Sequence, residues 1–283
     1  MKMLMIGAHP DDCELKCTGL ASKYVKDGHQ VRFLSLCNGC GGHHEMGPNE
    51  IAARRWLETR KSAEYLGIEY DVWDIPDCEL IADLATRARL VRYIREYAPD
   101  VIFCHRTNDY HADHRNAGIL LQDASYLLIV PNYCSEVPAL KQMPVIIHYE
   151  DRFMNPPFVP DVVIGIDDEM EKKCRAFSFH TSQAYEWLPY TYGTLSQVPE
   201  DEEARYEWMR GDVIDDNTPD EDILVGKFTG RNQKVAIVAA KYREQLVERY
   251  GEKGKKIVYA EAFAGCEYGS PLTEEKKKQI FPY

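Results

Sequence analysis

Two short stretches of the chain combine residue types that can bind a metal and move protons. The first, Ala8-His-Pro-Asp-Asp12, places one imidazole and two carboxylates directly after the apolar run Met3–Ile6. The second, Asp109-Tyr-His-Ala-Asp-His114, has two histidines three residues apart and follows the apolar run Val101–Cys104. Zinc is bound by histidine nitrogen and aspartate oxygen, and a catalytic zinc keeps one position open for water. The two stretches therefore predict a catalytic metal site, with additional carboxylates available for general acid–base catalysis.

The elements expected to position these stretches are strands that alternate with helices of 12 to 18 residues. This alternation indicates βαβ units and an α/β fold with a Rossmann-like, mostly parallel sheet and helices on both faces. In the common doubly wound order the first and fourth strands are neighbours, so both stretches would face one crevice. The expected strands are Met3–Ile6, Gln30–Leu36, Tyr70–Trp73 and Val101–Cys104, and the expected helices are Glu14–Lys26, Glu50–Leu66, Leu80–Tyr97 and His114–Tyr126.

The second half of the chain is less regular, and we expect it to complete the sheet and cover the site. Residues 1–283 are interpreted as a single domain with an acidic insertion at about 188–232, which we expect to be a surface segment or part of a lid. The tail from residue 273 to 283 is expected to be exposed. The expected strands are Val145–Tyr149, Val162–Ile166 and Lys256–Phe263, and the expected helices are Asp168–Trp187 and Val235–Tyr250.

Composition limits the classes of protein that fit. With 283 residues and 45% hydrophobic content, the chain can form a substantial core. A formal net charge of −12 argues against a broad nucleic-acid surface. No apolar run approaches the roughly 18 residues of a membrane span, and the first apolar run is too short for a signal peptide. Nine mostly isolated cysteines fit reduced thiols, so we expect a cytoplasmic protein, for which a homo-oligomer is possible.

At the level of whole motifs, the chain resembles a known family. Ala8-His-Pro-Asp-Asp12 with Glu14, together with Asp109-x-His-x-Asp-His114, is similar to the paired motifs of the LmbE-like (PIG-L type) metal-dependent N-deacetylases. The resemblance continues through most of the chain except roughly 188–232. The further matching segments are Arg55-x-x-Glu58 followed by Leu66-Gly67, Lys173 to Gln183 with Ala176 and His180-Thr-Ser-Gln, and Ala260-Glu-Ala-Phe263.

The resemblance implies roles for individual residues. It implies zinc, or another divalent metal, bound by His9, Asp12 and His114. It implies Asp11 as general base, and His111 as the donor that stabilises the developing oxyanion. Asp113 is expected to orient His111 and favour its protonated form, and Glu14 or a backbone carbonyl to hold a ligand histidine in its tautomer.

The resemblance also implies the substrate. Family members remove acetyl groups from N-acetylglucosamine units, so the expected partner is a small amino-sugar conjugate and the expected product is acetate. Arg55 is expected to contact a sugar hydroxyl or a phosphate. Lys141 stands near the place where the family often has an arginine before the strand Val145–Tyr149, and it is the second expected substrate contact.

Three other functions remain open from the sequence. The same scaffold could cleave another amide of a sugar conjugate, or the chain could be a non-catalytic metal-binding protein. It could also bind a nucleotide, although the first βα turn lacks G-x-G-x-x-G and carries two carboxylates where a pyrophosphate would lie. Cys37-x-x-Cys40-x-x-His43-His44 has the spacing of metal ligands, but we interpret it as a mobile loop that faces substrate.

Overall fold

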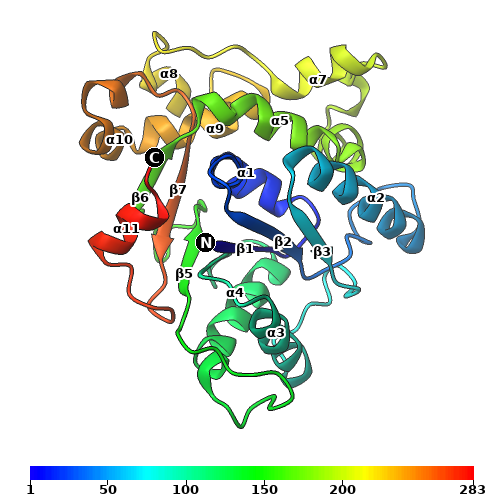
Figure 1. Ribbon diagram of the computed structural model, residues 1–283. Helices are drawn as coiled ribbons and strands as arrows, with labels where there is room; N and C mark the ends of the chain where they lie inside the picture. Colours follow the sequence, from blue (N-terminus) through cyan, green and yellow to red (C-terminus); the bar gives the residue numbers. More distant parts are fainter.

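The computed structural model describes all 283 residues, and it is built around one seven-stranded sheet with the order β3-β2-β1-β4-β5-β7-β6 (Figure 1). The first five strands are mutually parallel, while β7 runs antiparallel to both β5 and β6. The predicted α/β fold with a mostly parallel sheet is confirmed. The strands are β1 (Lys2–Gly7), β2 (Gln30–Ser35), β3 (Glu69–Val72), β4 (Val101–Cys104), β5 (Val145–Tyr149), β6 (Val162–Gly165) and β7 (Ala260–Gly265).

Helices cover both faces of the sheet, as predicted. Successive side chains of a strand point to opposite faces, and β1 is apolar on both: Met3 and Met5 belong to one core cluster, Leu4 and Ile6 to the other. The first cluster includes residues of α1, α2 and α5, and the second includes residues of α3 and α4. These helices are α1 (Asp12–Lys26), α2 (Pro48–Leu66), α3 (Leu84–Tyr97), α4 (Ala112–Ser125) and α5 (Met170–Ser178).

Two of the long helices predicted in the second half are interrupted. The predicted helix Asp168–Trp187 begins as a 3₁₀ turn, continues as α5, and resumes as a π-helical turn at Ser182–Trp187. The predicted helix Val235–Tyr250 is divided at Tyr242 into α9 (Gly230–Lys241) and α10 (Arg243–Tyr250). Apolar periodicity continued through both breaks, and so it did not reveal where the backbone hydrogen bonding changes.

The segment 188–232 and the tail are more ordered than the sequence indicated. The segment contains α6 (Leu188–Thr191), α7 (Glu202–Arg210) and α8 (Asp220–Leu224), and Tyr206 and Met209 of α7 reach the main core. The tail forms α11 (Glu274–Ile280); most of its residues are exposed or half-buried, as predicted, but Ile280 and Phe281 are buried against the same core. None of the helices is both long and apolar enough to cross a membrane.

The sheet order brings the two polar stretches together. β1 and β4 are adjacent, with Met3 paired to Val101 and Met5 to Phe103. Because parallel strands present their carboxyl ends at one edge, the loops after β1 and β4 meet there. The loop after β1 leads into α1, and the loop after β4 leads into α4. The crevice predicted between the first and fourth strands is confirmed.

Candidate active site

The three predicted metal ligands come together at the shared edge of β1 and β4. Nδ1 of His9 lies 3.6 Å from Oδ2 of Asp12, and Nε2 of His114 lies 3.3 Å from Oδ1 of the same carboxylate. One ligand atom from each residue lies within 4.8 Å of the others. Gly7 permits this turn, because a Cβ at that position would lie only 2.7 Å from Cβ of Asp12.

Each of the two imidazoles is held on its other nitrogen by a carboxylate. Nε2 of His9 lies 3.1 Å from Oδ2 of Asp113, and Nδ1 of His114 lies 2.9 Å from Oδ1 of Asp109. A carboxylate behind a histidine fixes its tautomer and raises its basicity as a metal ligand. These residues could therefore hold a metal ion, with Asp113 and Asp109 as supporting carboxylates.

The charges of the cluster agree with cation binding. Burial lowers the pKa of His9, but hydrogen bonds with Asp113 and Asp12 outweigh it and raise this pKa to about 10. Burial is likewise outweighed at His114, where the charge of Asp12 and a hydrogen bond with Asp109 raise the pKa to about 9. Without a metal these imidazoles hold protons at neutral pH. A divalent cation would displace those protons, and the donor set, two nitrogens and one carboxylate, suits zinc.

Other groupings of donors in this region fit a metal less well. His111 accepts a hydrogen bond on Nδ1 from the backbone N–H of Asp113, at 3.1 Å, so that nitrogen is occupied. Cys37 could be grouped with His9 and Asp77, but burial raises the pKa of its thiol far above the usual range. A thiol binds zinc only as the thiolate.

His105 also belongs to this cluster. It follows β4 directly, its ring stacks on His114 with 4.1 Å between centroids, and its Nε2 lies 3.2 Å from Oδ2 of Asp12. Burial and the charge of His114 lower its pKa to about 4, so the imidazole is neutral. His105 therefore supports the position of Asp12, a role that its place at a strand end could have indicated.

Asp11, the predicted general base, lies beside the trio and is held by Arg55. Nη2 of Arg55 donates to Oδ1 of Asp11 and to the carbonyl of Pro10, both at 3.0 Å. Burial raises the pKa of Asp11, and the Arg55 charge opposes that rise. The other carboxylate oxygen of Asp11 has no hydrogen-bond partner in the protein.

The two predicted substrate contacts are placed elsewhere. Arg55 is buried among Asp11, Asp77 and the carbonyls of Pro10 and Gly39, which argues against contact with substrate. Lys141 is exposed and precedes the amino end of β5. Since the candidate site is at the carboxyl ends of the parallel strands, Lys141 lies at the opposite edge of the sheet, and its assignment is corrected.

The predicted support of His111 by the Asp113 carboxylate is weak: Oδ2 of Asp113 lies 3.8 Å from Nδ1 of His111, and it does not keep the imidazole protonated. His111 is the N-cap of α4 and is bound by the backbone of Asp113, whereas the carboxylate accepts from Cys78 N at 2.6 Å and contacts His9. Burial and the charges of His9 and His114 lower the pKa of His111. Its side chain, 26% exposed, is therefore a neutral imidazole whose Nε2 can donate.

Glu14, expected to support a ligand histidine, instead forms a buried pair with a different one. Its Oε1 lies 2.8 Å from Nε2 of His180 and accepts from Oγ of Ser62 at 2.7 Å. The loop with Cys37 and Cys40 does not form a second four-ligand site. Within it, His43 contacts Glu186 and His44 stacks on Tyr190.

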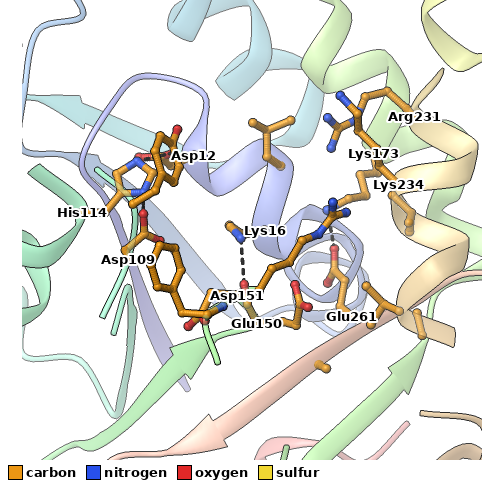
Figure 2. A pocket seen from close by; sticks show the side chains of 18 of the residues that line it. Asp12, Lys16, Asp109, His114, Glu150, Asp151, Lys173, Arg231, Lys234 and Glu261 are labelled. Atoms are coloured by element: carbon orange, nitrogen blue, oxygen red, sulfur yellow. Dashed lines mark hydrogen bonds and ion pairs between the residues drawn. The ribbon is translucent and has the colours of Figure 1, made fainter. Parts of the chain in front are cut away.

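A cavity of about 340 Å³ opens beside the trio (Figure 2). Asp12, Asp109 and His114 line one end, and Lys173, Arg231 and Lys234 lie at the other. Further lining residues come from α1 and from the segment after β5. They are Leu15, Lys16, Glu150, Asp151, Arg152 and Phe153. The C-terminal half therefore completes the wall of this cavity.

Comparisons with known proteins agree with this arrangement. The family model described as PIG-L, GlcNAc-PI de-N-acetylase, matches residues 4–125. A diacetylchitobiose deacetylase of Thermococcus kodakarensis is 32% identical over 217 residues, covering 69% of this chain and 79% of that protein. A 4-oxalmesaconate hydratase of Pseudomonas putida is 25% identical over 202 residues, covering 69% and 78%.

Among solved structures, an N,N'-diacetylchitobiose deacetylase from Pyrococcus horikoshii, complexed with its inhibitor MPG, has a similar fold. The TM-score is 0.67 at 23% identity, with 94% of this chain and 84% of that chain covered. The match extends beyond the residues of the family model into the C-terminal half, so the two proteins share the architecture of nearly the whole chain.

Proposed function

This chain belongs to the PIG-L family, and from that membership we propose that it is a zinc-dependent hydrolase that removes the N-acetyl group from an N-acetylglucosamine-containing substrate and releases acetate. Deacetylases among its relatives support a hydrolytic enzyme. We also propose a single domain located in the cytoplasm, which fits nine cysteines that form no disulfide.

The observation that carries the proposal is the pair of carboxylate-backed histidines around Asp12. Asp113 stands behind His9 and Asp109 behind His114, at 3.1 and 2.9 Å. Without a cation both imidazoles carry a proton beside Asp12, because the surrounding carboxylates raise their pKa to about 10 and about 9. A divalent cation could replace these two positive charges between the same groups. A bound zinc would polarise the amide carbonyl and lower the pKa of water.

Asp11 and His111 supply the remaining chemistry in this proposal. Arg55 holds one oxygen of Asp11, and the second oxygen is free to take a proton from the attacking water and pass it to the leaving amine. His111, fixed through Nδ1 by the start of α4, can donate from Nε2 to the carbonyl oxygen as negative charge develops there. Water and the amide thus give acetate and a free amine.

The test is acetate release by purified protein from a panel of N-acetylglucosamine conjugates. Protein that has been treated with chelator and dialysed should be inactive, and adding back one equivalent of zinc should restore the rate. Parallel additions of manganese and cobalt identify the preferred ion. Equal acetate release by the chelated and zinc-loaded protein would contradict a metal-dependent deacetylase.

A second candidate is hydration of an unsaturated carboxylate, since one relative is named 4-oxalmesaconate hydratase. The cationic end of the cavity, with Arg231 and Lys234, favours an acidic substrate of this kind. Both reactions add water, and both could use Asp11 to move its proton. A hydratase would consume the ultraviolet absorbance of a conjugated acid and release no acetate, so the two assays distinguish the candidates.

A further inference from the structure

The end of the cavity farthest from Asp12 and His114 carries positive charge that no carboxylate neutralises. Arg231 and Lys234 line it, Arg152 is a third cation of the same cavity whose charge acts on Lys234, and none of the three takes part in an ion pair within the protein. Figure 2 shows Arg231 and Lys234 together at that end, across the cavity from Asp12 and His114. In a chain of net charge −12, three unpaired cations in one cavity call for an explanation.

The acidic residues near these cations have other partners. Glu261 pairs with Lys173 at 2.7 Å, and Asp151 is bound by Arg106 through two guanidinium nitrogens. Glu150 lies 3.9 Å from Lys241. The partners of the two cations on α9 are neutral: Nζ of Lys234 lies 3.3 Å from the hydroxyl of Tyr192 and 4.5 Å from the centre of its ring, and Arg231 lies over the ring of Phe177. The cavity as a whole is lined by five carboxylates and five Lys or Arg side chains, so the unpaired positive charge is a property of this one end.

The position of the cations on their helix adds to the repulsion. Arg231 and Lys234 are in the first turns of α9, the end where the helix dipole already favours negative charge, and no acidic residue is present in that first turn. Burial, with the charges of Arg231 and Arg152, lowers the pKa of Lys234 to about 8. A bound anion would neutralise these like charges and remove their repulsion.

We propose that this basic end of the cavity binds an oxyanion, a carboxylate or a phosphate, that the substrate carries in addition to its acetamido group. The amino-sugar part of this proposal rests on the proposed function, and the anionic part rests on the cations that line the cavity. The substrate class is then an acidic N-acetylated amino sugar, with its amide at Asp12 and His114 and its anion at Arg231 and Lys234.

A second cavity adjoins the cationic end of the first and could hold a group attached to the anion. It has a volume of about 410 Å³, and it shares Leu188, Tyr192, Arg231 and Lys234 with the first cavity. Its other walls include the apolar side chains of Phe177, Trp208 and Met209. The cations thus stand where the two cavities meet, so a group linked through the anion, as in a phosphodiester, has space to continue.

The experiment is a calorimetric binding series on the full-length, metal-free protein near neutral pH, where Lys234 is protonated. Metal-free protein is used so that an anion cannot bind through zinc. The probes are inorganic phosphate, N-acetylglucosamine 6-phosphate, N-acetylmuramic acid, which has a carboxylate, and neutral N-acetylglucosamine. At least one acidic sugar should bind about tenfold or more tightly than the neutral sugar, the effect of a charge-assisted contact.

Variants show where the anion binds. Lys234→Gln and Arg231→Gln should each lower the affinity for the preferred acidic sugar by about tenfold and leave the affinity for the neutral sugar unchanged. Lys234→Arg should retain most of the affinity. Lys253→Gln, which removes an equal charge from an exposed residue outside both cavities, is the matched control and should change nothing. Circular dichroism verifies the fold of each variant.

The outcomes separate this proposal from the proposed deacetylase. Equal affinity for acidic and neutral sugars, or an equal loss in Lys253→Gln, would overturn the anion subsite even if acetate is released. Selective binding that depends on Lys234 and Arg231 supports the subsite even if no acetate appears from the zinc-loaded enzyme. A preference for the phosphate or for the carboxylate sugar identifies which oxyanion the substrate carries.

Discussion

Nε2 of His9 lies 3.1 Å from a carboxylate oxygen of Asp113, a residue 104 positions away in the chain. The contact joins the loop after β1 to the start of α4, and it leaves Nδ1 of His9 facing Asp12. The Asp113 carboxylate is itself fixed by the backbone N–H of Cys78 at 2.6 Å. One carboxylate therefore links three separate loops and sets the direction in which His9 can bind a metal.

Replacing the carboxylates behind the histidines should weaken metal binding without removing a ligand. Asp113→Asn and Asp109→Asn should each lower zinc affinity by about 10- to 100-fold. His9→Ala and His114→Ala should lose most of the metal. Competition with a chromophoric chelator measures these affinities, and Asp123→Asn, on the same helix α4 but exposed, is the control. Unchanged affinity in both asparagine variants would exclude this supporting role.

Asp11→Asn should retain the metal and the fold but lose most of the rate. Without a carboxylate that can take a proton from water, kcat should fall by about 10²–10⁴. Metal content by mass spectrometry and the melting temperature serve as controls, because Asp11 lies next to the ligand Asp12. An unchanged kcat would remove Asp11 from the mechanism.

Arg55 should affect turnover and not substrate binding. It contacts Asp11 and backbone carbonyls, and it does not line the cavity. Arg55→Lys should therefore lower kcat, because Lys cannot make the two contacts of the guanidinium, while KM changes less than about threefold. A large rise in KM at constant kcat would restore the substrate contact that the sequence suggested.

His111→Ala should retain zinc and lose the donor to the developing oxyanion. The expected loss is about 10²–10³ in kcat with little change in KM. His111→Gln places an amide N–H close to the position of Nε2 and should recover part of the rate. If zinc is lost with His111 but retained in His114→Ala, the two histidines have exchanged roles, and the ligand set would have to be reassigned.

The sequence was sufficient to predict the fold and the proximity of the two polar stretches because both depend on local patterns. Apolar runs such as Val101–Cys104 mark the central strands, and each polar stretch follows one of them. The neighbouring positions of β1 and β4 then bring His9 and His114 together. Because parallel α/β sheets adopt few topologies, the order of the predicted elements was enough to place the loops after β1 and β4 side by side.

The partners of individual side chains could not be predicted in the same way. Asp113 is adjacent to His111 and His114 in sequence, yet its carboxylate contacts His9, because α4 directs it across the crevice. Arg55 and Asp11 are 44 residues apart, and only the packing of α2 shows that they pair. Arg231 and Lys234 belong to a segment with no motif, so their charges became informative only when the cavity was seen.

The buried pair of Glu14 and His180 should stabilise the fold, whatever the catalytic role of its neighbours. Both side chains are fully buried and 2.8 Å apart, and Ser62 donates to the same oxygen of Glu14. His180→Gln removes one partner and leaves a buried carboxylate, so unfolding should become easier by about 3–5 kcal/mol. Urea unfolding of the two single variants and of the double variant Glu14→Gln/His180→Gln measures the coupling energy of the pair. The double variant should lose less unfolding free energy than the two single variants lose together.

The pH dependence of that stabilisation follows from the two pKa shifts. Burial raises the pKa of Glu14, but the charge and hydrogen bond of His180 outweigh it, so the folded pKa lies below the usual 4.5. Burial lowers the pKa of His180, but Glu14 outweighs it, so the folded pKa lies above the usual 6.5. The contribution of Glu14 to stability is complete above pH 4.5 and is lost as the pH falls through the lowered pKa of the folded state. The contribution of His180 is complete below pH 6.5 and is lost as the pH rises through the raised pKa of the folded state. The stability difference between wild type and His180→Gln should therefore be largest between these two pH values and decline on both sides, and a difference that does not vary with pH would mean that the pair is not ionised.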